Sequence, residues 1–177
     1  MKWSDFNLMW GRPLRSILAL FNNKKLTFKF NHLESTDYTI AEQDLKIISK
    51  KIKDLKDYNL FLKANNIVLS HTERERIILK RIKSISQSKN YKDILNKHLL
   101  TEVINIVENP YILISNFNKE YLKIPQEIII STLEKNQKYF PIFDVKGRLT
   151  NFFFVVANKK DEKNFISEGN KRVVEAR

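Results

Sequence analysis

The spacing of apolar residues changes along this chain, and those changes limit the folds that it can adopt. Residues 1–33 are expected to hold the first strands: 14–33 predict two strands, or a short helix and a strand, and Leu26, Phe28 and Phe30 alternate with polar residues as in a half-buried strand. In residues 43–108 the apolar residues recur at every third or fourth position, as on one face of a helix. Residues 110–158 mix both patterns, and 169–177 open another helix. This order predicts one α+β region over the whole chain, with helices packed on a mostly antiparallel sheet.

Three helices are expected in the middle part. The first, over 43–64, is predicted by an apolar stripe made of Leu45, Ile48, Ile52, Leu55, Tyr58 and Leu62. The second begins near Ser70, which has capping-box spacing to Glu73. The sequence SQSKN at 86–90 is expected to be a loop, and the third helix, over 91–108, ends before Pro110.

The sequence of the C-terminal third predicts a hairpin between two helices. Pro125 suits the first turn of a helix that ends near residue 140. The following hairpin should turn at Asp144–Gly147, where Gly147 tolerates a positive φ. Asn170 is a plausible N-cap for the last helix, with Gly169 before it.

The chain is strongly basic. Its 32 Lys and Arg against 20 Asp and Glu give a net charge of +12, which favours acidic partners and above all nucleic acid. A second interpretation is equally open, because abundant Lys, Asn and Ile are also the result of codon drift toward A and T. Charge therefore raises the hypothesis of RNA binding without establishing it.

One row of cations stands out on the second helix. Arg76, Lys80 and Lys83 follow one another at i, i+4 and i+7 and so share a face. That face is either a ridge that contacts phosphates or an ordinary solvated helix surface.

The sequence lacks the motifs that would indicate an enzyme active on its own. Three glycines form neither a phosphate-binding loop nor a dinucleotide fingerprint, and the chain has no cysteine. The histidines His32, His71 and His98 lack metal-ligand spacing, so we assign no catalytic and no metal-binding residue. The longest apolar run, 152–157, is too short to span a bilayer and no signal peptide is evident, so a cytoplasmic protein without a membrane partner is expected.

Many ordered residues resemble one known family. They begin with Met1, Lys2, Trp3 and the sequence RPLRSILALF, and continue with Glu102, Val103, Val107, Glu108, Pro110, Phe117, Tyr121, Leu122, Pro125 and Glu127. The densest block is Gln137, Lys138, Tyr139, Phe140 and Pro141, followed by Asp144, Gly147, Leu149, Asn158, Gly169, Asn170, Arg172, Val173, Ala176 and Arg177. This series resembles the beta subunit of the bacterial heterotetrameric glycyl-tRNA synthetase, and it is weakest over 34–90.

The resemblance implies an enzyme in which two kinds of subunit have separate roles. In that family the alpha subunit carries the catalytic core, which activates glycine with ATP and Mg²⁺, and the beta subunit binds tRNA. The chain would then be part of a glycine-tRNA ligase, with the alpha subunit in an alpha2beta2 assembly and tRNA(Gly) as partners. It would bind no cofactor and catalyse nothing alone. Its fold would resemble the B3/B4 editing-type module.

Three departures from the family pattern leave alternatives open. A Gly-His-Arg-Phe block is absent after Thr39, the family's Trp before the helix-ending proline is Asn109, and both ends look like internal points of a longer subunit. The alternatives are a stand-alone basic RNA-binding module and a remnant of a split beta subunit without function.

The block around Gln137 has two interpretations. In one, it is a helix-to-strand junction in which Tyr139 and Phe140 bury apolar area and Lys138 faces the helix C-terminus. In the other, Gln137 and Lys138 are exposed to RNA and Tyr139 stacks on a base. Arg172 is a further candidate for phosphate contact.

Overall fold

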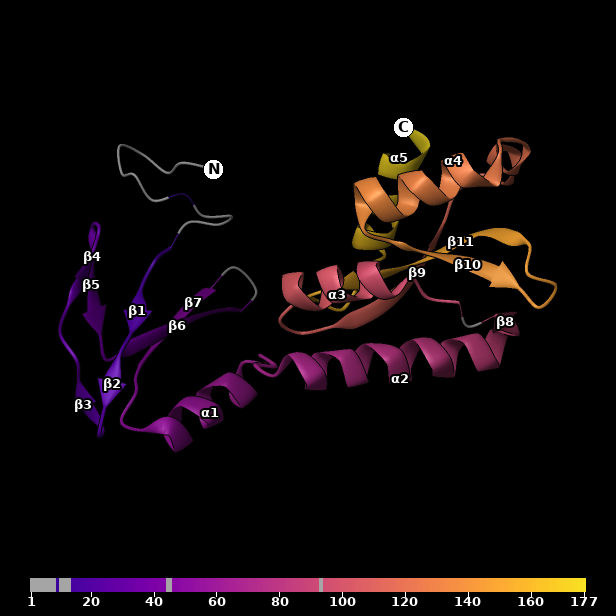
Figure 1. Ribbon diagram of the computed structural model, residues 1–177. Helices are drawn as coiled ribbons and strands as arrows, with labels where there is room; N and C mark the ends of the chain where they lie inside the picture. The colour runs from indigo at the N-terminus through magenta and orange to yellow at the C-terminus, as the bar shows by residue number, and fades with distance from the viewer. Residues whose placement is uncertain (1–8, 10–13, 44–45, 93) are drawn as a thin grey trace. The chain divides into compact units, whose positions relative to one another are not determined.

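The computed structural model in Figure 1 describes residues 9, 14–43, 46–92 and 94–177. The chain forms two compact units, Met1–Ile67 and Val68–Arg177, which are treated separately below. The predicted α+β class is confirmed, and of the strand pairs in the described ranges all but β1–β5 are antiparallel.

The first unit consists of short strands and one helix. Its elements are β1 (Ile17–Leu18), β2 (Leu20–Phe21), β3 (Lys24–Lys25), β4 (Lys29–Phe30), β5 (Leu33–Thr36), β6 (Tyr38–Gln43), β7 (Lys46–Lys51) and α1 (Leu55–Ala64). The strands form a β1-β5-β4 sheet and the hairpins β2-β3 and β6-β7. Asn22 and Asn23 turn the β2-β3 hairpin with φ of 48° and 61°, which asparagine tolerates better than most residues. The core contains Ala41, Ile52, Phe61 and Leu62.

The helix predicted over 43–64 is wrong in its first half. Residues 38–43 and 46–51 form the paired strands β6 and β7 instead, and Leu45 lies outside the described residues. Buried Ala41 pairs across the strands with Ile48, so cross-strand burial satisfies the apolar spacing that had suggested a helix. Helix α1 starts only at Leu55, after Asp54, whose carboxylate accepts a 2.7 Å bond from the backbone N–H of Asp57.

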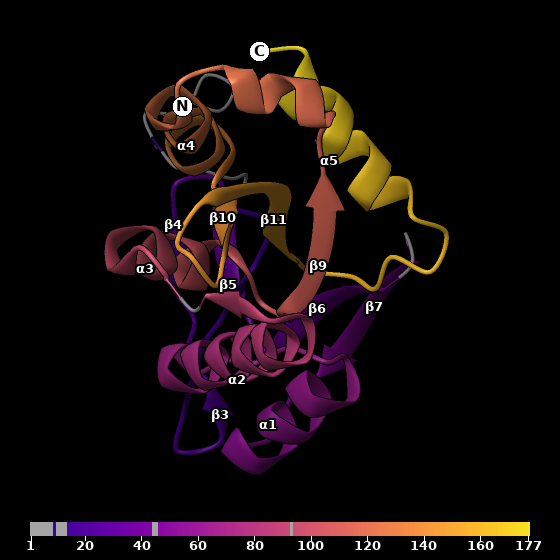
Figure 2. The same ribbon diagram turned by 90° about the vertical axis from the view of Figure 1, so that its right-hand side faces the viewer.

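The second unit is built around a four-stranded antiparallel sheet of order β8-β10-β11-β9. Its elements are α2 (His71–Lys89), β8 (Tyr91–Lys92), α3 (Lys97–Ile106), β9 (Tyr111–Asn116), the 3₁₀ helix η1 (Lys119–Lys123), α4 (Gln126–Ser131), the π-helix η2 (Thr132–Gln137), β10 (Phe140–Asp144), β11 (Leu149–Ala157) and α5 (Phe165–Glu175). Helices α2 and α3 lie on one side of the sheet, and α4 and α5 lie on the other (Figures 1 and 2).

Strand β11 is covered on both faces, which explains its unbroken apolar run. Phe154 packs with Ile78, Leu99 and other residues of α2 and α3 in one cluster. Phe153 and Val155, which point the other way because strand side chains alternate, pack with residues of α4, η2 and α5 in a second cluster. The sheet is therefore the middle layer of an α/β/α sandwich.

Several expected boundaries in this unit are wrong. The residues expected as a loop at 86–90 continue α2 to Lys89, and Asn90 ends it with a left-handed φ of 54°. The helix expected over 91–108 shortens to α3, since Tyr91 and Lys92 pair with Asp144 and Phe143 as a strand.

The last helix also begins earlier than predicted. Asn170 lies inside α5 and is not its N-cap, which is Asn164. The carboxylate of Asp161 accepts bonds from the backbone N–H groups of Ile166 and Ser167, at 3.0 and 2.7 Å, and so satisfies donors that the first turn leaves free.

Two local predictions are confirmed. The Ser70 hydroxyl accepts a bond from the Glu73 backbone N–H at 3.3 Å and caps α2. The β10-β11 hairpin turns at Asp144–Gly147, and Gly147 has a φ of 79°. Asp144 holds this turn, because its carboxylate accepts bonds from the backbone N–H groups of Lys146 and Arg148 at 2.9 Å each.

Candidate nucleic-acid interface

The six residues predicted to contact RNA lie on three elements of the second unit. They are Arg76, Lys80 and Lys83 on α2, Gln137 and Lys138 at the end of η2, and Arg172 on α5. Their surroundings differ, so each group is described separately.

The cations of α2 are on its solvent side. Ile78 and Ile82 are fully buried in the core, whereas Lys80 and Lys83 are exposed. No acidic side chain of the described residues lies within ion-pair distance of these two lysines. We call Arg76, Lys80 and Lys83 the α2 ridge.

Arg76 is the one member of the ridge with an acidic partner among the described residues. Its guanidinium donates to both carboxylate oxygens of Glu73, at 2.6 and 2.8 Å. This hydrogen-bonded contact lowers the pKa of Glu73 and raises that of Arg76. Arg76 is thus partly neutralised, and the unopposed charge of the ridge rests on Lys80 and Lys83.

The ridge continues into a stretch without acidic residues. Residues 77–92 contain five Lys or Arg and no Asp or Glu. Like charges four and three positions apart on one helix repel each other, at a cost of about 0.2–0.5 kcal/mol per pair. A polyanion laid along this helix would remove that repulsion.

Lys138 has a structural contact that the sequence did not reveal. Its ammonium forms a 2.5 Å ion pair with Glu102 of α3, and its backbone ends η2 with a left-handed φ of 61°. Gln137 beside it is half-buried. Both side chains are thus only partly exposed, and the ion pair joins the end of η2 to α3. RNA contact at Gln137 and Lys138 stays a prediction.

Tyr139 is half-buried and packs against the core of the second unit. Its ring is stacked on that of Phe153 at a centroid distance of 5.1 Å. Its hydroxyl donates a 2.7 Å bond to the side-chain oxygen of Asn170, and burial raises its pKa. These contacts favour the interpretation of the block around Gln137 as a helix-to-strand junction.

Arg172 is exposed on α5, which leaves it available for phosphate contact. The contacts of α5 with the rest of the unit are made by other residues of the helix. Val174 packs in the second core cluster, and the Ser167 carbonyl accepts a bond from Ser115.

Arg74 is a buried cation that the sequence analysis did not identify. Arg74 is 6% exposed, and its guanidinium donates to the backbone carbonyls of Val68, Leu69 and Ile104 at 2.6, 2.9 and 2.9 Å. The signal was present in the sequence, because Arg74 stands four residues before Ile78 on the apolar stripe of α2. It fixes the start of the second unit to the end of α3.

The described part of the chain contains no group of three or more His, Asp or Glu arranged to hold a metal ion. Within the same ranges, no helix combines the length and apolarity needed to cross a membrane.

The chain was compared with known proteins. A family model described as glycyl-tRNA synthetase beta subunit matches residues 1–177. Similar relatives include glycine–tRNA ligase beta subunits of Dictyoglomus thermophilum (35% identical over 178 residues), Dictyoglomus turgidum (34% over 178) and Rickettsia felis (31% over 180). These alignments cover 100% of this chain but only 26%, 26% and 27% of the relatives, so the chain spans about a quarter of their length.

Proposed function

Because the chain belongs to the glycyl-tRNA synthetase beta-subunit family, we propose that it is the part of a glycine-tRNA ligase beta subunit that binds tRNA(Gly) and supports assembly. The observation that carries this proposal is the family match over every residue of the chain. An alpha subunit, in an alpha2beta2 assembly in the cytoplasm, would supply the catalytic core and bind ATP with Mg²⁺. The chain itself would contribute binding and not chemistry.

The α2 ridge is the RNA contact that the geometry supports best. Lys80 and Lys83 are exposed and unpaired within the described residues, and no acid follows Glu75 until Asp93. Lysines in this arrangement bind successive phosphates without reading base sequence. Arg172, exposed on α5, is a second candidate contact.

Replacing both ridge lysines tests this contact. The variant Lys80→Gln/Lys83→Gln should bind tRNA more weakly at low salt. The slope of log affinity against log salt should become shallower by about 1.5, since each phosphate contact contributes roughly 0.7–0.9 to it. Fluorescence anisotropy of labelled tRNA(Gly) at several salt concentrations measures both quantities.

The matched control removes the same charge elsewhere in the unit. Lys119 and Lys123 are exposed on η1, so Lys119→Gln/Lys123→Gln lowers the net charge equally. The control should keep the wild-type slope. Equal losses in the two variants would mean that net charge acts without a defined contact, and the ridge would be rejected.

A further inference from the structure

A small cavity lies in the first unit, between the β2-β3 turn and the start of α1. It is open to solvent and has a volume of about 250 Å³, below the range of about 300–1,000 Å³ typical of sites for drug-sized ligands, so it has room for one small group. Apolar walls come from Leu18, Leu20 and Tyr58, which also border the core.

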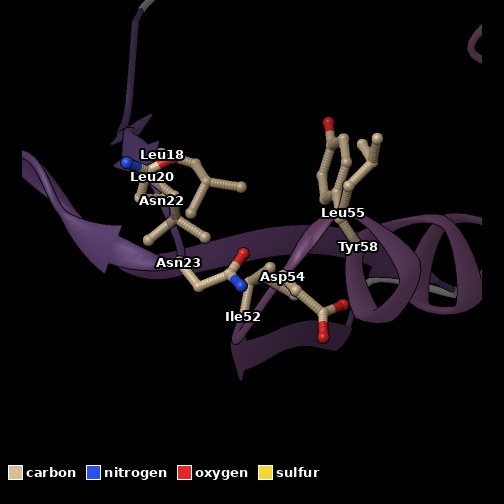
Figure 3. Close-up of a pocket in the computed structure, with 8 residues that line it drawn as sticks. All are labelled: Leu18, Leu20, Asn22, Asn23, Ile52, Asp54, Leu55 and Tyr58. Carbon is tan, nitrogen blue, oxygen red and sulfur yellow. The ribbon is translucent and has the colours of Figure 1, made fainter.

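The polar groups of the cavity suit the edge of a nucleobase. Asn22 and Asn23 line it from the turn, and Asp54 lines it from the start of α1 (Figure 3). An asparagine amide offers both a donor and an acceptor. The Asp54 oxygen Oδ1 accepts the Asp57 N–H, and its second oxygen has no hydrogen-bond partner among the described residues, so it can accept from an exocyclic amine.

An exposed aromatic ring and a lysine stand next to these asparagines. Phe21 precedes Asn22 and is 69% exposed, an unusual position for so large an apolar ring. It is directly opposite Lys24 in the β2-β3 pair, so both side chains leave the hairpin on one face, the opposite face to Leu20 of the cavity, and a strand that reaches both must pass around the Asn22–Asn23 turn. The ring offers a stacking surface for a base and the ammonium a contact for the neighbouring phosphate.

The composition around the hairpin supports the same partner. Residues 21–33 contain three Phe, three Lys, three Asn and no acidic residue. Phe28 and Phe30 are also exposed, at 41% and 44%. Exposed aromatics interleaved with cations are typical of surfaces that bind single-stranded nucleic acid.

We propose that the first unit binds unpaired RNA, with one base in the cavity beside Asn22 and Asn23, a base stacked on Phe21 and a phosphate at Lys24. This deepens the proposed function and rests on it, because the RNA partner is shared. It adds a contact to the bases of single-stranded RNA, whereas the α2 ridge contacts phosphates through charge alone.

The test uses the whole chain and two fluorescein-labelled probes. One is an unstructured 12-nucleotide RNA and the other is a blunt RNA duplex. Phe21→Ala should weaken binding of the single strand about ten-fold, because a stacked base contributes affinity of that order. Since stacking is not ionic, the salt slope and the affinity for the duplex should stay unchanged.

Two further variants separate the parts of the site. Asn23→Gly removes the amide, keeps the left-handed backbone that glycine tolerates, and should weaken single-strand binding about five-fold. Lys24→Gln should reduce the salt slope by about 0.7. The matched control is Phe165→Ala, which deletes a ring 74% exposed on α5 and should bind both probes as the wild type does.

The outcomes distinguish this site from the ridge. Single-strand affinity within two-fold of wild type for Phe21→Ala, equal losses for single strand and duplex, or an equal loss for Phe165→Ala would each overturn the proposal. A wild-type chain that does not bind the 12-nucleotide RNA at low salt would do the same. If Lys80→Gln/Lys83→Gln binds tRNA as the wild type does, while Phe21→Ala loses single-strand affinity as expected, the α2 ridge is rejected and the RNA site of the first unit is supported.

Discussion

Replacing Phe153 by alanine is expected to destabilise the second unit by about 3–5 kcal/mol, the usual cost of deleting a fully buried aromatic ring. Phe153 is 0% exposed in the centre of β11. Its ring is stacked with those of Tyr139 and Phe117, at centroid distances of 5.1 and 6.4 Å. The neighbouring helices cannot close the cavity fully, because the sheet holds β11 from both sides.

Urea denaturation followed by far-ultraviolet circular dichroism measures this loss, since α2 to α5 all belong to the second unit. Phe165→Ala is the matched control, because its ring is mostly in solvent and its loss should change the free energy of unfolding by less than about 0.5 kcal/mol. A Phe153→Ala protein as stable as this control would contradict the described packing between β11 and η2.

The second large effect concerns Arg74. The variant Arg74→Met keeps the length of the side chain but removes its three hydrogen bonds to backbone carbonyls. Bonds from a charged donor stabilise by about 1.5–3 kcal/mol each, and such contributions do not add fully. We expect a loss of about 3 kcal/mol, together with faster amide hydrogen exchange at the end of α3.

Arg81→Met provides the comparison for this variant. Arg81 is on the same helix but exposed, so its replacement should leave the free energy of unfolding within about 0.5 kcal/mol of wild type. If the two variants were equally stable, the clamp on Val68, Leu69 and Ile104 would not contribute to the fold.

Local signals in the sequence predicted much of the second unit. The Ser70 cap and the glycine turn of the β10-β11 hairpin follow from short-range chemistry, and the structure confirms them. Boundaries failed where a partner distant in the sequence decided the outcome. Tyr91 and Lys92 leave the helical pattern because β10 offers them a strand to pair with.

In the first unit, the spacing of apolar residues alone predicted the wrong secondary structure. Ile48 and Ile52 are four residues apart, which fits a helix, yet Ile48 is half-buried from strand β7 and Ile52 is buried directly after it. What decides the fold there is the pairing of Ala41 with Ile48 across the hairpin. The two residues are only seven positions apart, but helical spacing does not show that they pair across two strands.

The candidate interface was predicted in part. Exposure of Lys80 and Lys83 follows from the helical period, so the ridge could be located from sequence. The contacts of Lys138 with Glu102, and of Tyr139 with Asn170, join residues 36 and 31 positions apart and could not. Residues that carry the family resemblance thus contact one another in the structure.

The most direct measurement is the affinity of the whole chain for tRNA(Gly) and for an unrelated tRNA of equal length, over a range of salt. A tRNA-binding part of a glycine-tRNA ligase beta subunit should prefer tRNA(Gly) by several-fold, and the preference should persist near physiological ionic strength. Equal affinities that vanish together as salt rises would show that the charge of +12 acts only through counterion release. That result would contradict recognition of tRNA(Gly) by this chain and favour a general basic RNA-binding module.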